Sequence, residues 1–256
     1  VRSMEDVVKL RPLEPQDDLS YQMEALRLVR EELPRDKALI GFAGAPFTLA
    51  TYLVEGRPSR NYASTKSMMY RHPIVWHALM ERLSDMVSVH LKAQISAGAQ
   101  IVQLFDSWVG WLSPRDYLEY VFPYSKKILH SLRGLQAPLI HFGTGTGTLL
   151  TLMKAAGADV VGLDWRVRLD MAWAQLGCET AVQGNLDPAV LLAPFEVVRV
   201  QAEEVLMQAE GRPGHIFSLG HGLLPETPID NILRLVDFVR EWSSRRASEN
   251  TVSDQG

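Results

Sequence analysis

The sequence predicts an α/β protein whose parallel strands are flanked by helices. Six short apolar segments, each too short for a helix, alternate with longer segments of helical periodicity. Every one of the six is followed directly by glycine or small polar residues. A closed (β/α)8 TIM barrel gathers all the loops that follow its strands on one rim, whereas an open doubly wound sheet uses one or two of them. The six polar strand ends therefore favour the barrel.

The first predicted strand covers residues 39–43 and ends at Gly44-Ala45-Pro46, where Pro46 suits the first turn of a helix that carries Tyr52. The five later strands are expected, in chain order, over residues 99–105, 138–142, 159–163, 180–183 and 215–219. Helices are expected between them, with residues 1–18 as a connection and 57–71 as a surface loop.

We expect a single, incomplete barrel domain over residues 1–242 and a disordered polar tail over residues 243–256. A barrel of this class needs eight strands, and residues 1–33 offer no good candidate for the missing two. The first residue is Val1 rather than Met. We therefore expect the first two strands to lie upstream of this sequence.

The composition limits the classes of function. The 256 residues are 46% hydrophobic and 22% charged, with a formal net charge of −4. This balance gives no electrostatic reason to expect nucleic acid or an anionic membrane as a partner, and no apolar run is long enough for a membrane span. The single cysteine, Cys178, excludes an internal disulfide framework and fits a reducing, cytoplasmic compartment.

His221 is the most suggestive single residue. It lies between Gly220 and Gly222, directly after the last predicted strand, so its ring has no bulky neighbours in sequence. On local sequence alone, a histidine that satisfies the carbonyls of a tight turn is an equal alternative. The position on the rim favours a functional role.

Ser107 is a second candidate, because it follows a predicted strand and stands beside Asp106 on the expected rim. No G-x-S-x-G elbow surrounds it, so we expect a hydrogen-bond donor to a substrate carboxylate rather than a nucleophile. The loop of residues 143–147 (GTGTG) has backbone N–H groups for a carboxylate, but a flexible turn is an equal interpretation.

The remaining polar strand ends are interpreted as structural. Asp164 and Arg166 are expected to form an ion pair that fixes their loop. Asn185 and Asp187 are expected to be turn and N-cap residues. No cluster of histidine, cysteine and carboxylate has zinc spacing, so we expect no metal.

Six motifs together resemble the uroporphyrinogen decarboxylase family of haem biosynthesis. They are GFAGAPFTLATYLVEG at 41–56, QLFDSW at 103–108, HFGTGTG at 141–147, VVGLDW at 160–165, QGNLDP at 183–188 and SLGHGLLPETP at 218–228. The resemblance implies a (β/α)8 barrel, usually a homodimer, that works without metal or organic cofactor. It also implies removal of the four acetate carboxyls of uroporphyrinogen III to give coproporphyrinogen III.

The resemblance also implies roles for five residues. Tyr52 matches the tyrosine whose hydroxyl faces a substrate acetate, Ser107 a polar residue of the site, and His221 the site histidine. Phe42 and Phe105 would be apolar walls of the pocket. The family's N-terminal arginine motif and a site aspartate have no match here, so we expect both upstream of Val1 and expect this chain alone to be inactive.

Two alternatives remain open. A cobamide:coenzyme M methyltransferase shares the fold but uses a zinc held by a His-x-Cys pair, and Gly143 occupies the place of that cysteine after His141. A non-catalytic fragment that binds a tetrapyrrole or a partner protein is the other.

Overall fold

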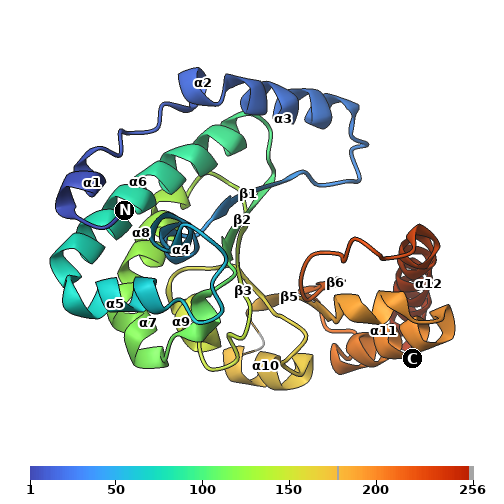
Figure 1. Cartoon of the computed structure of the whole chain (residues 1–256). Helices are drawn as coiled ribbons and strands as arrows, with labels where there is room; N and C mark the ends of the chain where they lie inside the picture. The colour runs from blue at the N-terminus through green and yellow to red at the C-terminus, as the bar shows by residue number, and fades with distance from the viewer. Residues whose placement is uncertain (178, 254–256) are drawn as a thin grey trace. The chain divides into compact units, whose positions relative to one another are not determined.

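The computed structural model describes residues 1–177 and 179–253, with side chains described as far as Arg245, so Cys178 lies outside the described residues (Figure 1). Six strands alternate with helices over these ranges, and all six predicted strands are confirmed. The chain divides into two compact units, Val1–Val161 and Gly162–Gly256, which are described one at a time. The expectation of one barrel domain over residues 1–242 stays a prediction.

The first unit holds three complete strands and ten helices. In chain order these are α1 (Met4–Val8), α2 (Pro15–Asp18), α3 (Ser20–Glu32), β1 (Ile40–Gly44), α4 (Pro46–Glu55), α5 (Ala63–Arg71), α6 (Pro73–Ser96), β2 (Ile101–Asp106), the short 3-10 helix η1 (Val109–Trp111), α7 (Pro114–Tyr120), α8 (Phe122–Leu132), β3 (Leu139–Gly143) and α9 (Leu150–Ala155). Strand β4 (Val160–Gly162) crosses the division between the units.

Strands β1, β2 and β3 pair side by side and parallel, with Phe42 opposite Gln103 and Leu104 opposite His141. Successive side chains of a strand point to opposite faces, so the residues of β2 divide into two sets. Leu104 packs into a hydrophobic cluster with α6 and α8, whereas the ring of Phe105 contacts Phe42 from β1. Asp106 shares the face of Leu104, toward the helices.

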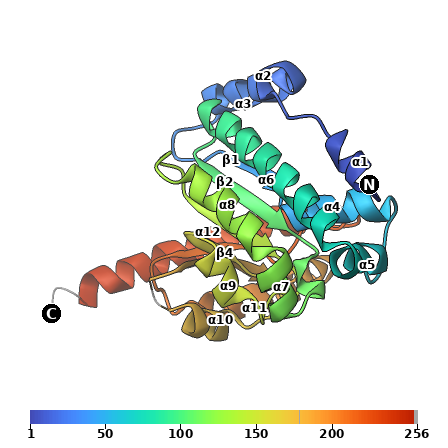
Figure 2. The ribbon, with the colours of Figure 1, turned by 90° about the vertical axis from the view of Figure 1, so that its left-hand side faces the viewer.

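Helices α6 and α8 lie alongside each other over β1 and β2 (Figure 2). The cluster between helices and strands is built from large aliphatic side chains, among them Leu91, Leu104, Ile128 and Leu129, all fully or almost fully buried. Full burial of each such side chain contributes roughly 1.5–3 kcal/mol. The long amphipathic α6 is therefore the main cover of the strands in this unit.

The second unit holds two complete strands. Its elements are α10 (Leu169–Leu176), β5 (Ala181–Leu186), the 3-10 helix η2 (Pro188–Leu192), α11 (Phe195–Gln208), β6 (His215–Leu219) and α12 (Ile229–Ser253). Strands β5 and β6 pair parallel, with Val182 opposite His215. Helix α11 contacts α10, β5 and α12.

Three expectations about local structure are corrected. The N-terminal connection contains the short helices α1 and α2, and the first begins with a capping box between Ser3 and Asp6. The expected loop over 57–71 ends at Tyr62, because α5 begins at Ala63. The last helix continues past Trp242 to Ser253, so residues 243–253 are helical, and residues 254–256 lie outside the described part.

A cluster of buried polar side chains lies between the strands and helices of the first unit. Asp106, expected on the rim, is instead fully buried, because it shares the helix-facing side of β2 with Leu104. Its Oδ1 accepts a hydrogen bond of 3.2 Å from the Thr48 hydroxyl of α4. Its Oδ2 lies 3.8 Å from Nε2 of His141 on β3, which is also fully buried. One carboxylate thus joins three elements.

Tyr117 and Ser125 extend this cluster into α7 and α8. Both are fully buried. Burial, and to a smaller extent the nearby charge of Asp106, raises the pKa of Tyr117 well above its ordinary value. The phenol is therefore neutral in the folded protein.

Replacing Asp106 with leucine is expected to destabilise the protein by about 2–4 kcal/mol, because the Thr48 hydroxyl loses its acceptor and His141 loses its anionic neighbour in a buried setting. Urea denaturation measures the effect. Asp237→Leu, at an exposed position of α12, is the control and should change the free energy of unfolding by less than about 0.5 kcal/mol. Equal stability of the two variants would refute this account.

Candidate functional site

Tyr52 lies on α4, a helix with clear start and stop signals. Pro46 occupies its first turn, and Gly56 ends it in the left-handed conformation with φ of 65°. The buried side of the helix is formed by Phe47, Ala50 and Val54. Tyr52 is on the other side and is 60% exposed, so its hydroxyl is accessible to a ligand.

The Tyr52 side chain lines a pocket of about 510 Å³, referred to below as the Tyr52 pocket. Its lining residues come from the end of α4, the following loop and the segment after β2: Thr51, Tyr52, Glu55, Gly56, Arg57, Pro58, Ser59, Tyr62 and Trp108. Trp108 is next in sequence to Ser107, so the pocket brings the neighbourhoods of two predicted site residues together. Sequence spacing alone does not predict this meeting.

Aromatic and charged groups shape the Tyr52 pocket. The ring of Tyr62 packs against Trp108, with 5.8 Å between centroids, and against Trp111 at 6.0 Å. Glu55 accepts hydrogen bonds of 2.9 Å from both the backbone N–H and the hydroxyl of Thr65 at the start of α5. Although burial acts in the opposite direction, these bonds lower the pKa of the Glu55 carboxyl, which is ionised near neutral pH.

Ser107 lies at the point where two loops meet. It is half-buried, and its carbonyl accepts a hydrogen bond from the hydroxyl of Thr144 in the glycine-rich loop after β3. Gly110 approaches the same loop so closely that a Cβ there would lie 2.1 Å from the Thr144 carbonyl oxygen. Gly145 adopts φ of 67°, as a tight turn requires. The loop is thus held against Ser107.

Phe42 and Phe105 lie on neighbouring strands and contact each other edge to face, with 5.7 Å between ring centroids. Phe105 makes a similar contact of 5.6 Å with Phe142 of β3. Phe42 is 58% exposed. The three rings form an apolar surface on the side of the strands away from α6 and α8, and their role as walls of a substrate pocket stays a prediction.

His221 belongs to the second unit. It is exposed, follows β6, and lies edge-on to the ring of Trp165 with 6.4 Å between centroids. A Cβ on Gly220 would lie 2.5 Å from the backbone nitrogen of Trp165, so glycine is required for this approach. The accessible ring expected from the Gly-His-Gly motif is confirmed, and its catalytic role stays a prediction.

The loop after β4 is fixed as predicted. The guanidinium of Arg166 lies 2.5 Å from the fully buried carboxylate of Asp164 and 4.0 Å from the ring centre of Trp165. Asn185, also buried, donates hydrogen bonds to the carbonyls of Asp164 and Val167. These contacts hold Trp165, and with it the surroundings of His221.

Asp187 is confirmed as an N-cap. Its carboxylate accepts a hydrogen bond of 2.9 Å from the backbone N–H of Ala189 at the start of η2. This capping role explains why an aspartate stands at position 187.

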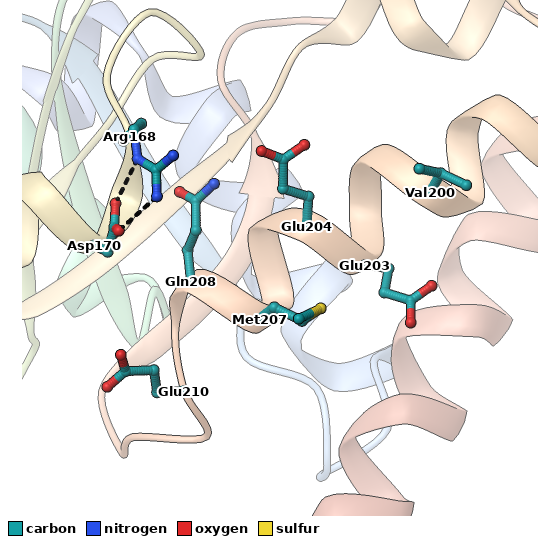
Figure 3. A pocket seen from close by; sticks show the side chains of 8 residues that line it. All are labelled: Arg168, Asp170, Val200, Glu203, Glu204, Met207, Gln208 and Glu210. Atoms are coloured by element: carbon teal, nitrogen blue, oxygen red, sulfur yellow. Dashed lines mark hydrogen bonds and ion pairs between the residues drawn. The ribbon is translucent and has the colours of Figure 1, made fainter.

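A second pocket, of about 450 Å³, lies between α10 and α11 (Figure 3). The residues that line it are Arg168, Asp170, Val200, Glu203, Glu204, Met207, Gln208 and Glu210. Arg168 is paired with Asp170 through contacts of 2.8 and 3.1 Å. The one guanidinium in the lining is therefore already paired, and the lining has no further cation to offer an anionic ligand.

Within residues 1–177 and 179–253, no group of three or more histidine, cysteine, aspartate and glutamate side chains is arranged to hold a metal ion. In that part of the chain no helix has the length and apolarity to cross a membrane.

Replacing Gly110 with alanine is expected to lower the free energy of unfolding by about 1–3 kcal/mol, because the new methyl group would overlap the backbone of Thr144 and Gly145. Thermal unfolding measures the change. Gly222→Ala is the matched control, since a Cβ there would meet no heavy atom within 4 Å. A Gly110→Ala protein as stable as the control would show that the two loops are not held together at this point.

The chain matches the family model described as "Uroporphyrinogen decarboxylase (URO-D)" over residues 1–242. It is 51% identical over 244 residues to uroporphyrinogen decarboxylase of Carboxydothermus hydrogenoformans, covering 95% of this chain and 70% of that protein. The enzyme of the same name from a Roseiflexus species is 51% identical over 249 residues, covering 95% and 72%.

Similarity to solved structures adds evidence on the fold. A B12-independent methionine synthase from a Shewanella species has a TM-score of 0.60 at 11% identity, covering 90% of this chain and 67% of that one. A protein described as a putative vitamin-B12 independent methionine synthase, from Listeria monocytogenes, has a TM-score of 0.57 at 12% identity, covering 86% and 69%. These similarities concern the fold alone, and they agree with the predicted α/β fold class, a TIM barrel.

The family model and the two bacterial relatives establish the family. The chain belongs to the uroporphyrinogen decarboxylase family.

Proposed function

We propose that the gene product carrying this sequence is a carboxy-lyase that removes the four acetate carboxyls of uroporphyrinogen III and yields coproporphyrinogen III, a step of haem biosynthesis. The observation that carries the proposal is the family match over residues 1–242. A homodimer in the cytoplasm, working without metal or organic cofactor, stays a prediction that rests on the resemblance.

The chemistry defines what the site has to supply. Protonation of a pyrrole ring at carbon creates a cation that acts as the electron sink. The bond between the acetate methylene and the carboxyl then breaks, CO₂ leaves, and the electron pair neutralises the ring. A proton delivered to the methylene carbon completes the methyl group, and the ring carbon then gives back the proton it first took up, which restores the neutral pyrrole. Positioned donors and a controlled electrostatic environment therefore matter more than a nucleophile.

Three residues are proposed to meet these needs. The exposed Tyr52 hydroxyl faces an acetate of the substrate and donates a hydrogen bond to it. Ser107, next to Trp108 of the same pocket, contributes a second hydroxyl donor. His221 supplies an exposed imidazole ring as a proton-transfer group. Phe42 and Phe105 are proposed as the apolar surface on which the pyrroles rest.

The cobamide:coenzyme M methyltransferase alternative requires a zinc-binding cysteine two positions after His141, where this chain has Gly143. A Cβ at Gly143 would lie 2.7 Å from Cγ2 of Thr146 and 3.0 Å from the carbonyl oxygen of Asp106. A cysteine there would therefore require the loop to shift.

Tyr52→Phe removes one oxygen and leaves the ring in place. It is expected to slow the decarboxylation by about tenfold or more, the effect of losing one well-placed hydrogen bond in the site. Anaerobic conversion of uroporphyrinogen III, followed by chromatography of the oxidised products, measures the rate. Tyr21→Phe, at a tyrosine of α3 that is 72% exposed, is the control. Equal slowing by both substitutions would contradict the role of Tyr52.

His221→Ala removes the exposed imidazole and is expected to reduce kcat/KM by at least about a hundredfold if the ring transfers protons. The same assay applies, with His72→Ala as a matched change at an exposed histidine before α6. Full activity of His221→Ala would exclude this residue from the chemistry.

A further inference from the structure

Arg57 is the cation of the Tyr52 pocket. It follows Gly56, whose left-handed conformation turns the chain away from α4, and it is exposed within a loop that lines the pocket. No carboxylate lies within 4.0 Å of its guanidinium among the residues that the structure describes. Arg60, three positions further on, is also exposed but does not line the pocket.

Glu55 is the one carboxylate that lines this pocket, and hydrogen bonds from Thr65 hold this anionic group in place. Its Oε1 accepts both hydrogen bonds from Thr65, so it faces the start of α5. Tyr52, Ser59 and Tyr62 contribute neutral hydroxyls to the lining. The guanidinium of Arg57 is thus the group in the pocket with five N–H donors and a positive charge to offer an anion.

We infer that Arg57 binds a carboxylate of the substrate and acts as an affinity-determining residue. A guanidinium matches a carboxylate with two parallel hydrogen bonds, and the half-buried ring of Trp108 in the same lining provides an apolar surface for a pyrrole. The inference rests on the proposed function, because that function supplies the class of ligand, a polycarboxylated tetrapyrrole.

The chemistry also determines which carboxylate Arg57 holds. The reacting carboxylate loses its negative charge as CO₂ forms, so an ion pair with it would stabilise the ground state more than the transition state and slow the reaction. An ion pair with a carboxylate that does not react persists through the transition state. Arg57 therefore holds a carboxylate beside the reacting acetate, and its contribution is uniform binding.

Steady-state kinetics with uroporphyrinogen III test this assignment in the full gene product. Arg57→Gln keeps a polar side chain, although a shorter one, and removes its charge. It is expected to raise KM by about tenfold, the loss of one charge-assisted pair, and to leave kcat within about twofold. Arg57→Lys should recover part of the affinity, and Arg60→Gln should leave KM unchanged. Uroporphyrin binding, followed by tryptophan fluorescence, should weaken by the same factor in Arg57→Gln.

The outcomes separate the inference from the proposed function. An unchanged KM in Arg57→Gln, an equal rise in Arg60→Gln, or a fall confined to kcat overturns the inference while the wild-type enzyme still works. A wild-type protein that binds uroporphyrin without converting uroporphyrinogen refutes the proposed function, and weaker binding by Arg57→Gln then still supports the anion site. A wild-type protein that neither converts nor binds refutes both.

Discussion

The geometry of the first unit depends on one buried carboxylate. Asp106 ends β2 on the side that faces the helices, where a charge is costly unless it is compensated. The Thr48 hydroxyl of α4 donates a hydrogen bond to this carboxylate, and Nε2 of His141 on β3 lies 3.8 Å from it. Because Tyr52 lies one helical turn beyond Thr48, and Ser107 directly follows Asp106, this carboxylate links the two segments that carry predicted site residues.

Backbone contacts complete the link that Asp106 begins. The N–H of Ala45, just before α4, donates a hydrogen bond of 2.8 Å to the carbonyl of Phe105, so α4 starts beside the end of β2. Gly110 and Thr144 then bring the next two loops into contact. These contacts connect α4, the end of β2 and the glycine-rich loop. The side chains of Tyr52 and Ser107 are therefore carried by backbone segments that are held in place.

The sequence predicted the elements better than the contacts between them. All six strands are predictable, because apolar runs bounded by glycine and proline have few other structures available. Helix α5 was missed because its buried residues, Thr65, Met68 and Met69, form too narrow an apolar stripe among polar neighbours. Asp106 was misplaced because the face to which a strand residue points depends on the orientation of the strand in the sheet. The Tyr52 pocket needs Trp108, about fifty positions away in the sequence, and the parallel pairing of β1 and β2 supplies it.

The charges that line the Tyr52 pocket can be compared with what a decarboxylation requires. A substrate with many carboxylates needs cations for affinity, yet the group that leaves as CO₂ must not be held as an anion. In the Tyr52 pocket, neutral hydroxyls on Tyr52 and Ser59 accompany two opposite charges, the guanidinium of Arg57 and the carboxylate of Glu55 that Thr65 holds through two hydrogen bonds. In the proposed function, Arg57 holds a carboxylate that does not react, and the hydroxyls meet the acetate that does. The pocket between α10 and α11 offers one guanidinium, and that guanidinium is already paired with Asp170, so its lining has no cation left for the same substrate.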